Sequence, residues 1–218
     1  MPVAPDTPDA ARRVHIKNCG LKTPEAIICA AASGASFIGF VHHLTSPRHL
    51  DAAAIDMLFT HVPPQVARVI VLVDPSNATL SALPAPDYWQ VHGVTDPARI
   101  AEIHRITGIP VITAIRIKDA SDLAAVSALE KVSAHLLFDA FHPGEMGGSG
   151  ITFDWALLAG VSPDKPWFLA GGLTADNVRD AVLQTRAPMV DVSSGIEDAP
   201  GVKSLEKIAA FGAAVLKA

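Results

Sequence analysis

The sequence predicts a single (β/α)₈, or TIM, barrel, and three observations support this. The chain has 218 residues, a length that barrels commonly use for one domain. Short runs rich in β-branched residues alternate eight times with alanine-rich, helix-favouring stretches, about 25 residues apart. The strand-like runs are almost continuously apolar and alternate with helices, which is typical of a parallel sheet covered by helices.

The elements follow one another in a regular order. Strands are expected at residues 13–18, 36–41, 67–73, 88–92, 110–117, 135–139, 166–170 and 189–193. The segments expected to be helical, each following its strand, are 24–34, 50–59, a short piece at 76–82, 96–108, 121–132, 153–160, 174–185 and 203–217.

Helix ends carry the expected signals. Capping oxygens, in two cases followed by a first-turn proline, stand at 23–25, 96–97 and 174–176. Gly34 and Gly108 follow helical stretches, as C-terminal caps do. An open doubly wound sheet is the alternative, but its first βα turn usually carries GxGxxG, whereas this chain has NCGLKTPE. The barrel is therefore favoured.

Composition limits the partners and the compartment. The net charge of −5 argues against nucleic acid or an anionic membrane as the main partner. Residues 1–12 contain three prolines and no apolar core of a signal peptide, and no apolar run reaches the length of about 18 residues that a membrane span needs. We expect a cytoplasmic protein with a flexible extension at 1–12 and a barrel domain at 13–218.

Reactive residues gather at one end of the expected barrel. Active sites of such barrels lie at the C-terminal ends of the strands. These ends carry Cys19, Arg48, Asp74, His92, Arg116, Asp139, Gly171-Gly172 and Ser193-Ser194-Gly195. The turns at the opposite end, ASGAS and ITGIP, have only packing and turn residues.

The last two strand ends suggest a phosphate site. AGGL and VSSGIE offer backbone N–H groups with little side chain around them, and Gly171, Gly172 and Gly195 allow close approach of a ligand. Glycines in tight βα turns are the structural alternative, which becomes weaker when two such turns lie on adjacent strands.

The two cysteines differ in their setting. With only two and no CxxC motif, neither a disulfide framework nor a structural zinc is indicated. Cys29 lies in an alanine-rich helical run and is expected to be a packing residue. Cys19 ends a strand on whose inner face Lys17 also lies, and a nearby ammonium favours the thiolate. Cys19 is thus either a base or nucleophile or a structural residue.

The nine histidines do not indicate a metal site. His42 and His43 are adjacent, so in a strand they point to opposite sides, and no HxH or HxxxH pair occurs. His92, at the end of a strand, is expected to contact a ligand or to support the site rather than to bind metal.

Six motifs together resemble the phosphoribosylanthranilate isomerase family of tryptophan biosynthesis. These motifs are KNCGL, GFVHHLTSPR, WQVHG, FDAFHPGEMGGSGITFDW, FLAGGL and VDVSSGIED, in this order from residue 17 to residue 198. The resemblance covers nearly the whole chain from residue 14. It implies an Amadori rearrangement of N-(5-phosphoribosyl)anthranilate to a carboxyphenylamino-deoxyribulose phosphate, without a cofactor, by a monomer or homodimer.

The resemblance also implies roles for individual residues. Asp139 would be the general acid that opens the ribose ring, and Cys19 the general base that removes the proton from C2. Arg48 would pair with the anthranilate carboxylate, Asp191 would accept a hydrogen bond from the anthranilate amine, and His92 would contact the substrate. The residues expected to bind phosphate are Gly148, Gly171, Gly172, Ser194 and Gly195.

Two departures from the family pattern and three rival functions remain. Asn18 stands where the family often has an apolar residue, and Ile151 where it usually has lysine. A ribulose-phosphate epimerase would need metal-binding His and Asp at strand ends, and an imidazole-pathway isomerase would show a half-barrel repeat and an aspartate in place of Cys19. A non-catalytic barrel that binds a phosphorylated ligand would lack the pair of Cys19 and Asp139.

Overall fold

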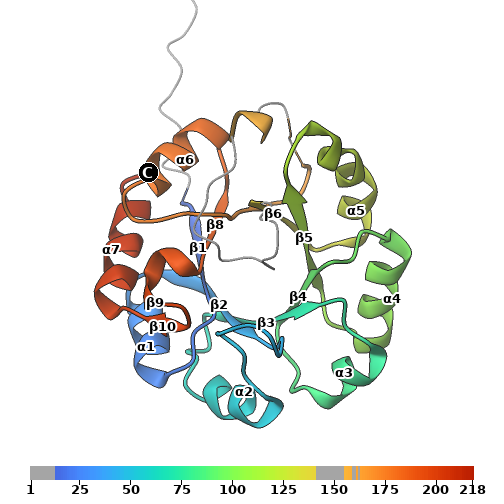
Figure 1. Cartoon of the computed structure of the whole chain (residues 1–218), viewed down its shortest axis with the longest axis horizontal. Helices are drawn as coiled ribbons and strands as arrows, with labels where there is room; N and C mark the ends of the chain where they lie inside the picture. The colour runs from blue at the N-terminus through green and yellow to red at the C-terminus, as the bar shows by residue number, and fades with distance from the viewer. Residues whose placement is uncertain (1–12, 141–154, 159–160, 162) are drawn as a thin grey trace, which may run out of the picture.

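The predicted barrel is confirmed in the computed structural model, which describes residues 13–140, 155–158, 161 and 163–218. Eight parallel strands close into a barrel in sequence order, with β1 paired to β8, and helices surround it (Figure 1). The strands are β1 (His15–Cys19), β2 (Ala35–Val41), β3 (Ala67–Val73), β4 (Tyr88–His92), β5 (Val111–Ile117), β6 (His135–Ala140), β7 (Phe168–Leu169) and β8 (Met189–Val192).

The outer ring consists of α-helices and short 3₁₀ segments. Its α-helices are α1 (Pro24–Ala32), α2 (Ala52–Phe59), α3 (Asn77–Ala82), α4 (Pro97–Thr107), α5 (Val126–Val132), α6 (Val178–Thr185) and α7 (Leu205–Val215). The 3₁₀ segments are η1 (Ala120–Ala125), η2 (Trp155–Leu158) and η3 (Ser194–Ile196). In the described part of the 153–160 segment, where we expected a helix, the structure therefore has the single 3₁₀ turn η2.

The predicted caps are confirmed at two of three helix starts. The side chains of Thr23 and Asp96 accept hydrogen bonds from the first turns of α1 and α4, and Gly108 ends α4 with φ 71°. The expected cap at 174–176 is wrong. The amide of Asn177 instead accepts from the Thr174 N–H and donates to the Gly172 carbonyl, so it braces the turn after β7 and α6 begins later.

Alternation along the strands creates two apolar regions. Side chains such as Ile16, Ile38 and Phe138 face the helices, whereas Phe37 and Phe168 belong to a separate cluster inside the barrel. Because side chains alternate along a strand, the polar residues of the inner face come together at the carboxyl ends of the strands.

A small hairpin after β8 was not expected from the sequence. β9 (Glu197–Ala199) and β10 (Val202–Lys203) form a separate two-stranded antiparallel sheet, so the helix expected from residue 203 begins only at Leu205. The signal was present in the sequence. Pro200-Gly201 is a typical pair for the centre of a tight turn, and Gly201 has φ 78°.

Within the described ranges, no helix is both long enough and apolar enough to cross a membrane.

Candidate active site

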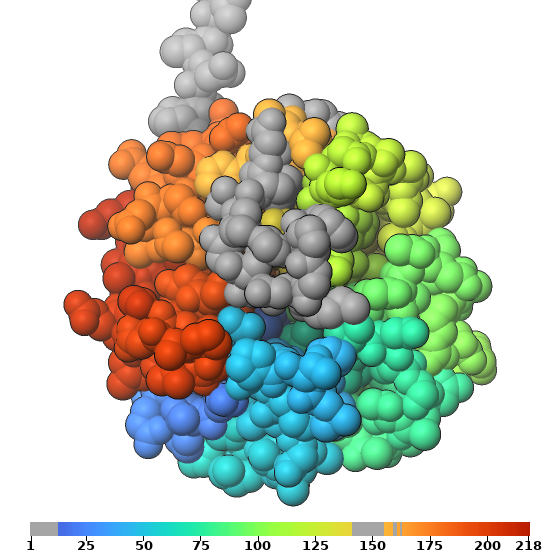
Figure 2. Space-filling view, in the orientation of Figure 1, coloured from blue at the N-terminus to red at the C-terminus, as the bar shows by residue number. Residues whose placement is uncertain are grey.

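A cavity of about 640 Å³ opens at the carboxyl ends of the strands. The predicted residues that line it are Cys19, Arg48, His92, Asp139, Gly171, Gly172, Asp191 and Ser194. Figure 2 shows the described elements as a ring around the centre of this barrel. The structure thus brings together side chains that are up to 175 positions apart in the sequence, between Cys19 and Ser194.

Lys17 lies beneath Cys19 and forms a buried ion pair. β1 and β8 place Lys17 opposite Asp191, and the Lys17 Nζ donates to Asp191 Oδ1 over 2.9 Å. Lys17 has no exposed surface, and Asp191 is 8% exposed. Burial favours the neutral amine, but the charge of Asp191 holds the pKa of Lys17 above its usual value.

The Cys19 thiol is less acidic than the sequence suggested. Burial raises its pKa above the usual value, and the charge of Lys17, which acts in the expected direction, does not offset that effect. Asp191 adds to the effect of burial, because it both pairs with Lys17 and places a negative charge near the sulfur. In the ligand-free protein Cys19 is therefore mainly a thiol at neutral pH.

Gly39 makes room for these two side chains. It lies opposite Cys19 in the β1–β2 register, and a Cβ on Gly39 would lie 2.8 Å from Cys19 Sγ and 3.1 Å from Lys17 Nζ. We did not single out this residue from the sequence, although a glycine inside a strand pattern is a signal of close approach.

Asp139, the penultimate residue of β6, lines the cavity and is 6% exposed. Burial, and after it the negative charge of Asp191, raises the pKa of Asp139 to about 7. Arg116, its neighbour in the β5–β6 register, opposes this shift without cancelling it. A carboxyl group poised near neutral pH is suited to donate a proton, because both of its protonation states are populated.

His92 forms a pair with Gln90 on the inner face of β4. The Gln90 amide nitrogen lies 2.8 Å from His92 Nε2, within hydrogen-bond distance. Burial, and after it the charge of Lys17, lowers the pKa of His92 to about 3. His92 is therefore a neutral side chain in the cavity wall, which agrees with a contact role. Gln90 is a further lining residue that the sequence analysis did not identify.

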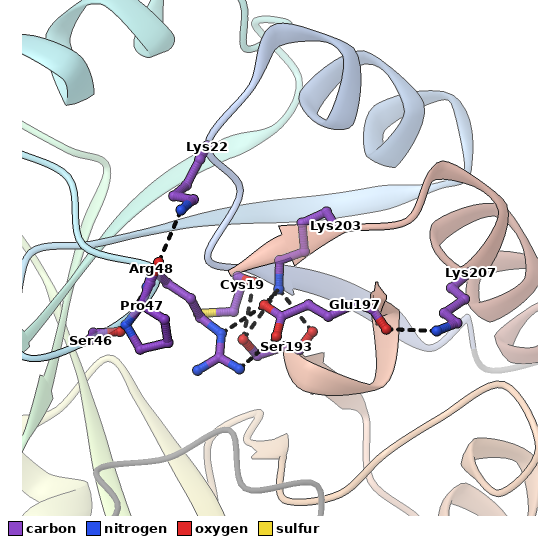
Figure 3. Close-up of polar contacts among 9 residues, drawn as sticks. All are labelled: Cys19, Lys22, Ser46, Pro47, Arg48, Ser193, Glu197, Lys203 and Lys207. Atoms are coloured by element: carbon purple, nitrogen blue, oxygen red, sulfur yellow. Dashed lines mark hydrogen bonds and ion pairs between the residues drawn. The ribbon is translucent and has the colours of Figure 1, made fainter. Parts of the chain in front are cut away.

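Arg48 is held by a carboxylate that the sequence analysis missed. Its Nε and Nη2 atoms each donate to one oxygen of Glu197, both over 2.8 Å (Figure 3). Glu197 comes from β9, and Lys203 from β10 donates to its Oε1 over 2.7 Å. All three side chains are at most 10% exposed. The unrecognised hairpin thus supplies two charges of the site.

The glycines of the turns after β7 and β8 have different roles in the structure of the cavity. Gly171 and Gly172 line the cavity with φ 86° and 64°, and a Cβ on Gly171 would lie 2.5 Å from the Ala140 nitrogen. Gly195 is not among the lining residues, and its Cβ position is occupied by the Leu173 carbonyl oxygen. Gly195 therefore lets the turns after β7 and β8 pack together. Gly148 and Ile151 lie outside the described residues.

Two further expectations concern Asn18 and metal binding. Asn18 is 2% exposed and has the opposite parity to Lys17 and Cys19, and its Oδ1 has no hydrogen-bond partner among the described residues. Among the described residues, His, Cys, Asp and Glu side chains form no group of three or more that could hold a metal ion.

Comparisons with known proteins identify the family of this chain. Residues 16–214 match the family model described as N-(5'-phosphoribosyl)anthranilate isomerase. The protein of that name from Azorhizobium caulinodans is 47% identical over 208 residues, which are 93% of this chain and 91% of the relative.

Two solved structures are also similar. Phosphoribosyl anthranilate isomerase from Thermotoga maritima has a TM-score of 0.83 and 30% identity, and the match covers 94% of this chain and all of that one. A phosphoribosyl anthranilate isomerase in complex with reduced 1-(o-carboxyphenylamino)-1-deoxyribulose 5-phosphate has a TM-score of 0.81 and 27% identity, with the same coverage. This chain belongs to the N-(5'-phosphoribosyl)anthranilate isomerase family.

Proposed function

We propose that this chain converts N-(5'-phosphoribosyl)anthranilate into 1-(2-carboxyphenylamino)-1-deoxyribulose 5-phosphate, with Asp139 as general acid and Cys19 as general base. The observation that supports it most directly is the placement of a carboxyl group with a pKa of about 7 in the same cavity as a cysteine above a buried lysine. Family membership supports the overall reaction.

The first step is ring opening. Asp139 gives its proton to the ribose ring oxygen while the bond between that oxygen and C1 breaks. The lone pair of the anthranilate nitrogen forms the C1–N double bond, which leaves a positively charged Schiff base. The raised pKa of Asp139 suits this step, because a fully ionised aspartate would have no proton to donate.

The second step is proton removal from C2 by Cys19. The electrons of the C–H bond form a C1–C2 double bond, and the nitrogen regains its lone pair, giving an enolamine that tautomerises to the ketone. A positive charge on the Schiff base favours the thiolate, so ring opening counteracts the burial that raises the pKa of Cys19. No cofactor takes part in either step.

Binding is divided among the other polar residues. Arg48 pairs with the anthranilate carboxylate, for which a planar guanidinium is suited, and Asp191 accepts a hydrogen bond from the anthranilate amine. His92 contacts the substrate as a neutral side chain. The backbone of Gly171, Gly172 and Ser194 binds the phosphate, with Gly195 fixing the turn and Gly148 completing the site.

The protein acts in the cytoplasm as a monomer or homodimer, and residues 13–218 form one catalytic domain. The rival reading is a barrel that binds the phosphorylated ligand without turnover. It predicts the same cavity but no isomerisation.

One experiment separates the two readings. The purified protein is mixed with N-(5'-phosphoribosyl)anthranilate, and product formation is followed, together with complementation of a tryptophan auxotroph that lacks the isomerase. We expect turnover and growth with the wild type and loss of both with Asp139→Asn. Tight binding of the reduced product without turnover by the wild type would instead establish the non-catalytic reading.

A further inference from the structure

The hairpin β9–β10 places an unusual group of charges at the cavity. Arg48 and Lys203 both donate to Glu197, so two cations share one carboxylate (Figure 3). Glu197 Oε1 accepts from Arg48 Nε over 2.8 Å and from Lys203 Nζ over 2.7 Å. Burial favours the neutral acid, but the hydrogen bond from Arg48 and the charge of Lys203 hold the pKa of Glu197 below its usual value.

Burial lowers the pKa of Lys203 below its usual value, and the charge of Glu197 opposes this effect without cancelling it. The contacts of its Nζ are those of an ammonium group. Its Nζ lies 2.7 Å from Glu197 Oε1, 2.8 Å from the Ser193 carbonyl oxygen and 3.4 Å from Ser193 Oγ. An ammonium has three N–H donors, and each has an acceptor here. Ser193 in turn donates from Oγ to the Cys19 carbonyl oxygen over 3.3 Å, which connects the hairpin to the ends of β8 and β1.

The hairpin also contacts the loop that carries Arg48. A Cβ on Gly201 would overlap the Pro47 carbonyl oxygen, so only glycine lets the tip of the hairpin approach this backbone. Lys22 donates to the same oxygen over 3.0 Å, and its Nζ would lie 3.2 Å from a Cβ on Gly201. The position of Arg48 is therefore fixed through both its side chain and the backbone of the preceding residue.

The charge balance bears on anion binding. A two-pronged pair of arginine and glutamate is neutral as a whole, and a neutral pair in a buried site has little attraction for an incoming carboxylate. Lys203 adds a second cation to the same carboxylate, so the group of three keeps a net positive charge. At 4% side-chain exposure, Lys203 is screened much less than a surface lysine would be.

We propose that Lys203 is a positioning and specificity-determining residue: it neutralises Glu197, so that Arg48 is held rigidly by that carboxylate and yet retains its attraction for the carboxylate of the substrate. This inference rests on the proposed function, because it concerns the ligand carboxylate assigned to Arg48. It extends that function to two residues of the hairpin, neither of which touches the reacting atoms.

The test compares two lysines of neighbouring elements. Lys207 donates to the Glu197 backbone carbonyl over 2.7 Å, but its side chain is 48% exposed and pairs with Asp198. Lys203→Met and Lys207→Met remove the same charge. Binding of reduced 1-(o-carboxyphenylamino)-1-deoxyribulose 5-phosphate and of its analogue without the carboxyl group is measured by calorimetry, with KM and kcat for the substrate.

We expect Lys203→Met to weaken binding of the carboxylated ligand about 10- to 100-fold, the range for losing a charge-assisted interaction. Binding of the analogue without the carboxyl group should change less than about threefold, and KM should rise more than kcat falls. Lys203→Arg, which keeps the charge, should restore most of the affinity. Lys207→Met should behave as the wild type in all of these measurements.

Several outcomes would overturn the inference. If Lys203→Met loses the same affinity for both ligands, Lys203 only supports the fold of the site. If the affinity for both ligands is unchanged, the charge of Lys203 is irrelevant to binding. If Lys203→Met does not fold, Lys203→Gln, whose amide can still donate to Ser193, gives the same comparison. A wild type that neither turns over substrate nor binds either ligand would instead overturn the proposed function itself.

Discussion

Lys17 and Asp191 form an ion pair of 2.9 Å inside the barrel, directly below the cysteine that faces the cavity. The pair is nearly free of solvent contact, and adjacent strands hold both partners in register. The field at Cys19 is therefore that of a cation and an anion together, and the burial of the sulfur dominates its pKa. Lys17 has a structural role in addition to any effect on the thiol.

The first prediction concerns this ion pair. Lys17→Met should lower the free energy of unfolding by about 3–5 kcal/mol, because it leaves the Asp191 carboxylate buried without its cation. The double variant Lys17→Met/Asp191→Asn should recover a large part of the loss. Urea unfolding followed by circular dichroism measures both. A double variant no more stable than the single one would show that the unpaired charge is not the cause.

The second prediction separates the two cysteines. Cys19→Ser should lower kcat about 10²- to 10⁴-fold, since a serine hydroxyl is a far weaker base than a thiolate. Cys29, on α1, lies 3.4 Å from the Leu205 carbonyl oxygen and faces away from the cavity. Cys29→Ser should leave kcat within about twofold of the wild type and shift stability by less than about 1 kcal/mol. Similar kinetics for the two variants would contradict the role of Cys19.

The third prediction links activity and stability at Asp139. Asp139→Asn should lower kcat about 10²- to 10⁴-fold with little change in substrate binding, because the amide keeps the shape but cannot act as the acid. Steady-state kinetics and binding of the reduced product test this. Near-full turnover by the variant would show that another group supplies the proton.

The stability of the same variant should depend on pH. The folded protein raises the pKa of Asp139 from 3.8 to about 7, so it binds this proton more tightly than the unfolded chain does. Wild-type stability should therefore fall as pH rises from about 4 to about 7, by at most about 4 kcal/mol from this group. Asp139→Asn does not lose stability in this way. The difference in unfolding free energy between the variant and the wild type should therefore shift in favour of the variant across that range and then stay constant. Thermal unfolding of both proteins at pH 5 and pH 8 measures the difference.

The fourth prediction concerns Asn18, which faces the helices rather than the cavity. Its buried Oδ1 has no hydrogen-bond partner among the described residues, and such an atom costs about 1–3 kcal/mol. Asn18→Val should raise the melting temperature and leave kcat and KM unchanged, because valine suits a strand and needs no partner. A lower melting temperature would show that the amide contributes an interaction that stabilises the fold.

Much of this architecture could be predicted from residue order. The apolar strands and the capping residues carry local signals. Strand bounds place Cys19, His92, Asp139 and Asp191 near the carboxyl ends of their strands, and strand parity points these side chains inward. The pairing of Arg48 with Glu197 could not be predicted in this way. It joins residues 149 positions apart through a hairpin that packs on a loop, and no periodicity specifies such a contact.

The pKa of Cys19 shows a second limit of sequence reasoning. The inner face of β1 correctly predicts that Lys17 lies near the sulfur, but the sign of the net effect depends on Asp191 and on the depth of burial. Both come from the closure of β1 against β8, which is a property of the whole barrel. The requirement for glycine at position 39 also depends on a neighbouring strand, because a Cβ there would meet the side chains of β1.

The hairpin at Glu197–Lys203 is built outside the barrel sheet, as a two-stranded unit of its own. The barrel strands supply the closed sheet, Cys19 and Asp139. A different segment of the chain, the hairpin, supplies the charges of Glu197 and Lys203 next to Arg48. A library that varies only these seven positions would leave the eight barrel strands, Cys19 and Asp139 unchanged in sequence. Under the proposed role of Arg48, this short segment is where to begin if the barrel is to accept N-phosphoribosyl derivatives of aromatic amines with another substituent in place of the carboxylate.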